Sequence, residues 1–309
     1  DYEDPGLMIR DAETAMHRAK VEGKSEIKIF DQNMHKQALK LLHMDSDLRK
    51  ALENQEFLVF YQPIIALYSV QLAGFEALIR WHHPQKGLVS PGEFIPVAEE
   101  TELIMPIGEW VLEKACYQAQ KWQAKYERDD LYISVNLSAK QFKQGNLSDK
   151  INDILDSSGL AHSSLQLEIT ESVIMENARA SINMLEQLQS CGPKISIDDF
   201  GTGYSSLSYL QRFPIDSLKI DRSFVFTLDQ GEDNYEFVKT IRTLARNLGL
   251  AVIAEGVETL DQLNLLQKLK CEFAQGYYFA KPMEAEKAEK FLSEPLPWCA
   301  STSKTSCQQ

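Results

Sequence analysis

Short apolar runs alternate with amphipathic stretches along residues 57–280. The runs have the length and the β-branched or aromatic content of strands, whereas most stretches between them repeat apolar residues at helical spacings of three and four. The expected strands are 57–65, 72–81, 132–138, 165–172, 194–200, 217–224, 251–257 and 273–280. Strands that alternate with helices predict an α/β fold, and eight of them predict closure into a TIM-like (β/α)8 barrel.

The first two expected strands depart from this regular pattern. Only the six residues ALYSVQ, 66–71, separate them, which is too short for a crossover helix. Parallel neighbours need a long connection, whereas antiparallel neighbours can be joined by a short turn. The sequence therefore predicts a barrel that begins with an antiparallel strand hairpin.

Polar side chains share one face of the expected strands and fall near their carboxyl ends. Because successive strand residues point to opposite faces, Ile195 and Ile197 lie opposite Asp198. Six strands repeat this arrangement, and the polar residues concerned are Glu76, Arg80, Asn136, Glu168, Asp198, Lys219, Asp221 and Glu255. In a barrel the aliphatic faces meet the outer helices, so the polar residues are expected to converge on the carboxyl-terminal mouth, where barrel active sites lie.

The converging residues favour a site for hard divalent cations. The candidate oxygen ligands are Glu76, Asn136, Glu168, Asp198, Asp199 and Glu255. Crowded carboxylates repel one another unless cations hold them, and oxygen ligands select Mg²⁺ or Mn²⁺ rather than zinc. So many carboxylates indicate two ions that share a ligand, an arrangement that clamps a phosphodiester for in-line attack. Lys219 and Arg80 add cations for a phosphate or an attacking water.

Simpler interpretations apply to each residue taken alone. A single Asp or Glu at a strand end is more often a solvated loop residue or a helix cap, so only the whole set argues for a site. His82 and His83 are interpreted as loop histidines, because no third nitrogen or sulfur ligand lies on another strand. The glycines of DDFGTG, residues 198–203, indicate a mobile or tightly turned loop but do not prove a phosphate cradle.

Composition narrows the class of partner. The net charge of −13 and the pI of about 5.0 argue against attraction to DNA or to an anionic membrane. A small anionic substrate stays open if metal ions invert the local field. The five cysteines are scattered, namely Cys116, Cys191, Cys271, Cys299 and Cys307. They favour a reducing compartment, and no apolar run is long enough for a membrane span. We therefore expect a cytoplasmic location, with membrane attachment through upstream segments left open.

The motifs resemble a known family. The segment FEALIRWHHPQKGLVSPGEFIPVAEETELI carries Glu-Ala-Leu at residues 76–78 and resembles EAL-family cyclic di-GMP phosphodiesterases. Further motifs follow in the family's order, namely YQPI, SVNLS, LEITES, IDDFGTGYSSLSYL, LKIDRSFV, AEGVET and QGYYFAKP. The resemblance covers about residues 45–293 and is specific, because so many motifs match in sequence.

The resemblance implies a role for each matched residue. The ligands of a first metal would be Glu76, Asn136, Glu168 and Asp198. Asp198 would bridge to a second metal held also by Asp199 and Glu255. The catalytic residues would be Glu255, as general base, and Lys219, which would position the attacking water. The substrate contacts would be Gln62, Arg80, Asp221 and Gln275, while Glu171 would steady the DDFGTG loop.

The implied reaction is hydrolysis of cyclic di-GMP to linear pGpG by metal-activated water, with two Mg²⁺ or Mn²⁺ ions. Calcium is expected to inhibit, because its larger and looser coordination fits a magnesium site poorly. Two other interpretations stay open, a catalytically silent cyclic di-GMP receptor and a partner-binding scaffold that relays upstream signals. Silent modules typically lose metal ligands and this chain keeps them all, which favours the enzyme. A homodimer formed near the DDFGTG loop also stays open.

The ends of the chain are interpreted separately. Residues 1–44 resemble the last helix and strand of a GGDEF domain followed by a linker helix, with IKIF, residues 27–30, as the strand. The GGDEF signature itself is absent, so a cyclase is excluded. The absence of an initial Met leads us to expect a piece of a longer protein with upstream GGDEF and sensory domains. Residues 45–296 form the expected barrel, and the polar tail 297–309 is expected to be disordered.

Overall fold

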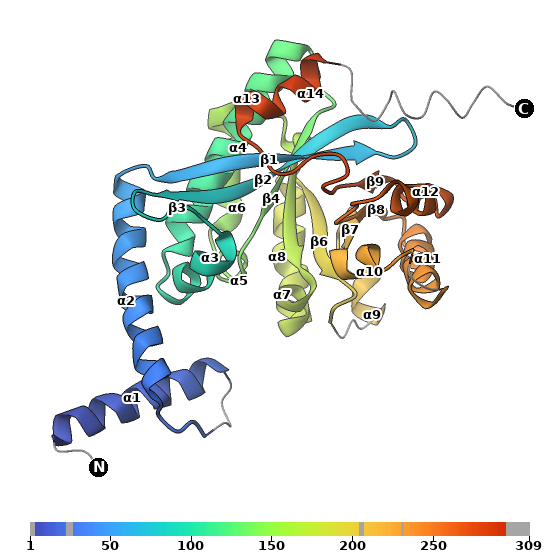
Figure 1. Ribbon diagram of the computed structural model, residues 1–309. Helices are drawn as coiled ribbons and strands as arrows, with labels where there is room; N and C mark the ends of the chain where they lie inside the picture. Colours follow the sequence, from blue (N-terminus) through green and yellow to red (C-terminus); the bar gives the residue numbers. More distant parts are fainter. Residues whose placement is uncertain (1–3, 23–26, 204–206, 230–231, 295–309) are drawn as a thin grey trace, which may run out of the picture. The chain divides into compact units, whose positions relative to one another are not determined.

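A computed structural model describes residues 4–22, 27–203, 207–229 and 232–294 (Figure 1). Its strands are β1 (Phe57–Ala66), β2 (Gln71–His83), β3 (Gly87–Val89), β4 (Tyr132–Asn136), β5 (Leu165–Thr170), β6 (Lys194–Phe200), β7 (Ser217–Ile220), β8 (Ala251–Ala254) and β9 (Phe273–Ala274). The longer helices are α1 (Pro5–Glu22), α2 (Gln32–Glu53), α3 (Pro91–Glu100), α4 (Ile104–Tyr126), α6 (Leu147–Ser158), α8 (Ala178–Ser190), α11 (Glu232–Asn247) and α12 (Leu260–Lys268). The shorter ones are α5 (Ala139–Phe142), η1 (His162–Ser164), α7 (Glu171–Glu176), α9 (Leu207–Leu210), α10 (Arg222–Phe226), α13 (Ala285–Ala288) and α14 (Lys290–Ser293).

The chain forms two compact units. The N-terminal unit consists of Asp1–Phe57 and Trp81–Leu103, and the barrel unit consists of Leu58–Arg80 and Ile104–Gln309, within the described residues. The barrel unit contains every strand end on which the expected site lies. None of the described helices has the length and apolar character that crossing a bilayer requires.

Eight strands close the barrel in the order β1-β9-β8-β7-β6-β5-β4-β2, and β2 pairs back with β1 (Figure 1). The neighbours from β2 through β4 to β9 are parallel. In contrast, β1 is antiparallel to β9 and forms a hairpin with β2 through a four-residue turn. The predicted TIM-like barrel with an antiparallel first hairpin is confirmed.

Several predicted strands are longer than the observed ones, and two of them extend furthest past the observed ends. The predicted strand 217–224 ends at Ile220, because Asp221 accepts a hydrogen bond from the Ser223 amide and begins α10. The predicted strand 273–280 keeps only β9, because the chain then turns and the Val257 amide donates to the carbonyl of Gln275. Both predictions followed apolar content alone, and they included residues whose backbone groups form hydrogen bonds outside the sheet.

The two faces of the barrel strands separate apolar from polar side chains. Ile195, Ile197 and Leu218 are completely buried on the outer face, where α8 packs on β6 and α11 packs on β7 and β8. The inward side chains include Ser134, Gln166, Glu168, Ser196 and Lys219, all buried. The interior of this barrel is therefore polar, and its charged groups need partners within it.

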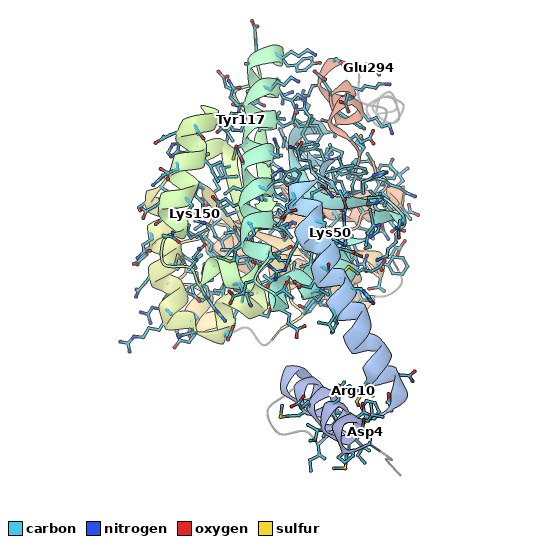
Figure 2. The ribbon with its side chains drawn as sticks, turned by 90° about the vertical axis from the view of Figure 1, so that its left-hand side faces the viewer. Asp4, Arg10, Lys50, Tyr117, Lys150 and Glu294 are labelled. Carbon is cyan, nitrogen blue, oxygen red and sulfur yellow. The ribbon has the colours of Figure 1, made fainter. Side chains whose placement is uncertain are left out.

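Helices α4 and α6 lie side by side on the outside of the barrel unit, where Figure 2 labels Tyr117 and Lys150. The Tyr117 hydroxyl donates to the carbonyl of Ser157, and Lys150 pairs with Glu109. These contacts join the two helices at their surface, while their apolar faces are buried.

Trp122 of α4 fills the space between the helix and the first hairpin. Its ring lies 4.9 Å from the centroid of Tyr61 and 4.9 Å from that of Phe75, and it is completely buried. Trp122→Ala should lower the free energy of unfolding by about 3–5 kcal/mol, because it leaves a large cavity. Urea denaturation measures this. Tyr68→Ala, at a fully exposed side chain, is the control and should change the value by less than about 0.5 kcal/mol.

The N-terminal unit contains α1, α2 and α3. Helix α2 begins where the Asp31 side chain accepts a hydrogen bond from the Met34 amide at 2.9 Å. The predicted IKIF strand is wrong, since residues 27–30 pair with no other strand among the described residues. Ile27 and Ile29 are 93% and 85% exposed. The domain boundaries at 44 and 296 stay predictions, and the tail 297–309 lies outside the described residues.

Candidate active site

The carboxyl ends of the parallel strands bring the predicted residues together in the mouth of the barrel. Register pairs Asn136 with Glu168 across β4 and β5, and Glu76 with Ser134 across β2 and β4. Asp198 lies near the end of β6, and Glu255 directly follows β8, where its amide donates to the carbonyl of Ile220. Alternation turns these side chains to the same, inward face of the barrel strands, as the sequence predicted.

Lys219 of β7 lies at the centre of this group and is completely buried. Its Nζ lies 2.5 Å from Glu255 Oε1, 2.7 Å from Glu168 Oε2 and 3.4 Å from Asp198 Oδ1. A fourth carboxylate, Glu76, lies 3.7 Å from it. We name this group, Glu76, Glu168, Asp198, Lys219 and Glu255, the carboxylate–lysine cluster.

The cluster has more negative than positive charge, which shifts its proton equilibria. Burial alone would lower the pKa of Lys219, but the carboxylates of Asp198, Glu168, Glu255 and Glu76 raise it well above its ordinary value. Burial raises the pKa of Glu255 to about 8, with Lys219 opposing the shift and Asp198 and Glu76 adding to it. Burial likewise raises the pKa of Glu168 well above its ordinary value. One ammonium does not neutralise four carboxylates, so the cluster favours additional cations.

A chain of amides holds one edge of the cluster. The Gln62 Nε2 donates to the carbonyl of Ala280 at 3.0 Å, which turns its Oε1 toward Gln275. The Gln275 Nε2 donates to that Oε1 at 2.9 Å and also to Glu76 Oε2. The Gln275 Oε1 is buried and has no hydrogen-bond partner among the described residues. This oxygen is therefore a preformed acceptor for a ligand donor.

Asn136 supports the opposite side of Glu76. Its Nδ2 donates to Glu76 Oε1 at 2.7 Å. Since this contact uses the amide nitrogen, the carbonyl Oδ1 of Asn136 is the atom that can act as a metal ligand. The same hydrogen bond holds the Glu76 carboxylate in place.

Asp199 breaks the alternation of β6. Strict alternation would place it with Ile195 and Ile197, away from the mouth. Its φ is +54°, in the left-handed region, and the register between β6 and β7 shifts between Ile197 and Phe200. This turn brings one oxygen each of Asp198, Asp199 and Glu255 within 4.8 Å of one another. Backbone strain of this kind, costing on the order of 1–3 kcal/mol, is found mainly at functional sites.

The loop after β6 is held from outside the cluster. The Glu171 Oε2 accepts a hydrogen bond from the Gly201 amide at 2.9 Å, and Glu171 is buried. A Cβ at Gly203 would lie 3.0 Å from Glu171 Oε1, so this carboxylate lies against the loop. This is the contact that the predicted loop-steadying role requires.

A pocket of about 260 Å³ opens above the cluster. The predicted residues that line it are Gln62, Glu76, Asn136, Asp198, Glu255 and Gln275. Arg80 and Asp221 are not among its lining residues. The Arg80 guanidinium lies 5.5 Å from the Phe60 ring centroid and donates to the carbonyl of Ile79, and Asp221 caps α10.

Other residues that sequence reasoning did not assign to the site also line the pocket, among them Arg222 and Glu258. Arg222 and Glu258 follow the ends of β7 and β8 by two and four residues, in segments where strand alternation no longer applies. Position alone, just beyond a strand end, is the signal that would have included them.

The donor set fits hard divalent cations. The grouped ligand atoms of Asp198, Asp199 and Glu255 are all carboxylate oxygens, and Asn136 and Glu168 add further oxygens nearby. Such oxygens suit Mg²⁺ and Mn²⁺ and lack the nitrogen or sulfur that zinc prefers. The fold and the site together define a TIM-like barrel protein with an acidic, oxygen-donor centre at its carboxyl-terminal mouth.

Comparison with known proteins gives the family. The profile of the EAL domain matches residues 45–282. The bifunctional diguanylate cyclase/cyclic di-GMP phosphodiesterase MucR of Pseudomonas aeruginosa is 46% identical over 280 residues, 91% of this chain and 41% of MucR. The cyclic di-GMP phosphodiesterase PdeR of Escherichia coli is 38% identical over 293 residues, 95% of this chain and 44% of PdeR. The chain belongs to the EAL domain family.

Solved structures agree with this assignment. The structure of the PaMucR phosphodiesterase in complex with c-di-GMP has a TM-score of 0.77 and 47% identity, covering 81% of this chain and 99% of that one. The chain spans about two fifths of the length of the curated relatives. The names of these relatives therefore describe proteins that are longer than the part that matches this chain.

Proposed function

We propose that the protein hydrolyses cyclic di-GMP to linear pGpG with Mg²⁺ or Mn²⁺ as cofactor. The observation that carries this proposal is the carboxylate–lysine cluster in the barrel mouth, with its excess of negative charge. The identity to proteins named as cyclic di-GMP phosphodiesterases supports the choice of substrate.

The ligands divide into two groups. We assign Glu76, Asn136, Glu168 and Asp198 to a first ion, and Asp198, Asp199 and Glu255 to a second. Bound divalent ions supply charge stabilisation to the phosphodiester and lower the pKa of water.

The chain's own residues position the reactants. Lys219 orients Glu255 through its 2.5 Å contact, so that the free oxygen of Glu255 is available as general base for the attacking water. Because Lys219 also contacts Glu168 and Asp198, one ammonium sets the relative positions of three carboxylates. Preorganised charge of this kind lowers the cost of reaching the transition state.

The substrate side relies on amides and an arginine. The buried Gln275 Oε1 accepts from a substrate N–H or hydroxyl, and its orientation is set by Gln62. Burial lowers the pKa of Arg80, and Tyr277 and Glu76 oppose this shift. We assign the Arg80 guanidinium, which lies over the Phe60 ring, to substrate binding. We assign Glu171 to stabilising the loop after β6 and Asp221 to capping α10. Burial and the charge of Asp198 raise the pKa of Asp199, and the charge of Asp221 adds to this shift.

A silent cyclic di-GMP receptor is the second candidate. The complete donor set favours turnover over binding alone, because a receptor has no need of clustered carboxylates. For the full-length protein, we also propose upstream GGDEF and sensory domains and a homodimer.

The test is incubation of the purified chain with cyclic di-GMP and Mg²⁺ or Mn²⁺, with chromatographic detection of pGpG. We expect pGpG with either ion, no product in EDTA, and loss of turnover when Ca²⁺ replaces Mg²⁺. Tight binding without turnover in both ions would establish the receptor instead. Full activity in EDTA would exclude the metal centre.

A further inference from the structure

The turn that follows β6 packs against two aromatic rings. Gly201 has a φ of +101°, and a Cβ there would lie 3.0 Å from Phe224 Cε2 and 3.4 Å from Phe237 Cε1. The two rings come from α10 and α11, and their centroids are 4.4 Å apart with planes tilted by 32°. We name Phe224 and Phe237 the aromatic pair. A side chain at position 201 would crowd both rings, so glycine permits this close approach.

The barrel wall holds the aromatic pair in place. Helix α10 begins directly after β7 at its Asp221 cap, and at its last residue the carbonyl of Phe226 accepts a hydrogen bond from Gln262 Nε2 at 3.3 Å. Helix α11 packs on α10, β7 and β8 (Figure 1). Phe224 packs against the main core, while Phe237 is 39% exposed. The pair is therefore a fixed surface for the turn beside it.

Hydrogen bonds within the turn connect this surface to Asp199. The Thr202 amide and the Thr202 hydroxyl donate to the carbonyl of Asp199, at 3.3 Å and 2.9 Å. Gly201 lies inside this turn, and its own amide donates to Glu171 Oε2 of α7 at 2.9 Å. Side chains from three helices, α7, α10 and α11, therefore restrain the backbone that carries Asp199.

This restraint matters because the backbone of Asp199 is strained. A φ of +54° at a residue other than glycine costs on the order of 1–3 kcal/mol and persists only where the surroundings fix it. In this conformation an oxygen of Asp199 lies within 4.8 Å of oxygens of Asp198 and Glu255. Relaxation to an extended backbone would turn the side chain to the outer face that strand alternation gives it.

We infer that the aromatic pair keeps Asp199 in its ligand position and thereby sets the affinity for the second divalent ion. This inference rests on the assignment of Asp199 to that ion in the proposed function. The rings of Phe224 and Phe237 offer no ligand atom, so both are positioning residues. Loss of a residue that orients a metal ligand typically lowers metal affinity about 10–100-fold.

The experiment measures Mn²⁺ binding to the purified chain without substrate, by electron paramagnetic resonance of the free ion. Phe224→Ala should weaken the binding of one of the two Mn²⁺ ions about tenfold and leave the other unchanged. Phe237→Ala should give a smaller loss in the same direction, because its ring is partly exposed and lies further from position 201. Phe224→Met should recover most of the affinity, since an unbranched side chain can still cover Gly201.

A double-mutant cycle separates positioning from general damage. Asp199→Ala removes the ligand that the aromatic pair is inferred to hold. If Phe224 acts through Asp199, Phe224→Ala should cause no further loss of Mn²⁺ affinity in the Asp199→Ala background. Damage that spreads through the site would instead add to the loss.

The matched control is Phe291→Ala on α14, because Phe291 is also partly buried and packs against the main core. This variant should retain the wild-type affinity for both Mn²⁺ ions. Urea denaturation in EDTA should show a similar fall in the free energy of unfolding for Phe224→Ala and Phe291→Ala. A difference in Mn²⁺ affinity between the two then reports the position of Asp199 rather than stability.

Two results would overturn the inference. One is wild-type Mn²⁺ affinity in Phe224→Ala, and the other is a loss that adds in full to that of Asp199→Ala. Both leave the proposed function intact where the wild type forms pGpG. A wild type that binds two Mn²⁺ ions without turnover overturns the phosphodiesterase activity alone, and a tenfold loss in Phe224→Ala would still support the inference. A wild type that binds no Mn²⁺ overturns both.

Discussion

Asp198→Ala is expected to abolish hydrolysis of cyclic di-GMP, lowering kcat/KM on the order of 10³-fold. Asp198 belongs to both proposed ligand groups, so its loss disturbs two cations at once. The charge stabilisation supplied by metal ions is worth several kcal/mol, and each ~1.4 kcal/mol corresponds to a tenfold change in rate. Steady-state formation of pGpG measures the effect.

Stability distinguishes this loss of activity from damage to the fold. Lys219 keeps three other carboxylate partners when Asp198 is removed, and the removal relieves repulsion within the cluster, so the free energy of unfolding in EDTA should stay unchanged or rise. Asp198→Asn keeps the shape and tests the charge, while Asp149→Ala, at an exposed position on α6, is the control. Substantial turnover by Asp198→Ala would mean that the metal ligands are wrongly assigned.

The strand positions of the candidate site could be predicted from alternation alone. Asn136, Glu168, Asp198 and Lys219 lie within strands, where the direction of a side chain follows from its position. Parallel pairing then places their carboxyl ends side by side. Local patterns therefore predicted both the barrel and the polar residues in its mouth.

Residues beyond the strand ends could not be placed in this way. Asp199 reaches the mouth only because its φ of +54° interrupts the alternation, which no pattern of apolar residues indicates. Gln275 follows the two-residue strand β9, and its direction depends on hydrogen bonds to Gln62 and Glu76. Arg222 and Glu258 line the pocket beside Gly256, where a Cβ would lie 2.6 Å from the Cβ of Arg222. Each of these positions depends on contacts between distant segments.

Lys219 has contacts that suggest a second role beside the predicted one. The resemblance assigned it to the attacking water, yet its buried ammonium contacts four carboxylates of the chain itself. These ion pairs, together with the hydrogen bonds to Glu168 and Glu255, compensate the buried charge of Lys219. Lys219 is therefore a structural counter-ion as well as a candidate catalytic residue.

Lys219→Met tests this second role and should both inactivate and destabilise the protein. Methionine has a similar length but no charge, so the carboxylates lose the cation that holds them together. Breaking a buried ion pair by removing one partner costs about 3–5 kcal/mol, and the free energy of unfolding in EDTA should fall by that amount. Urea denaturation measures the loss. Lys194→Met, at the exposed first residue of β6, is the control.

The pairing of charge is tested by a second substitution. Glu168→Gln in the Lys219→Met background removes one of the unpaired carboxylates, and it should recover part of the lost stability but none of the turnover. Mg²⁺ should stabilise Lys219→Met more than the wild type, because the added cation takes over part of the missing charge. Wild-type stability of Lys219→Met in EDTA would show that the carboxylates tolerate one another without the ammonium. In that outcome Lys219 serves the reaction alone, and the polar interior of the barrel owes its stability to its hydrogen bonds.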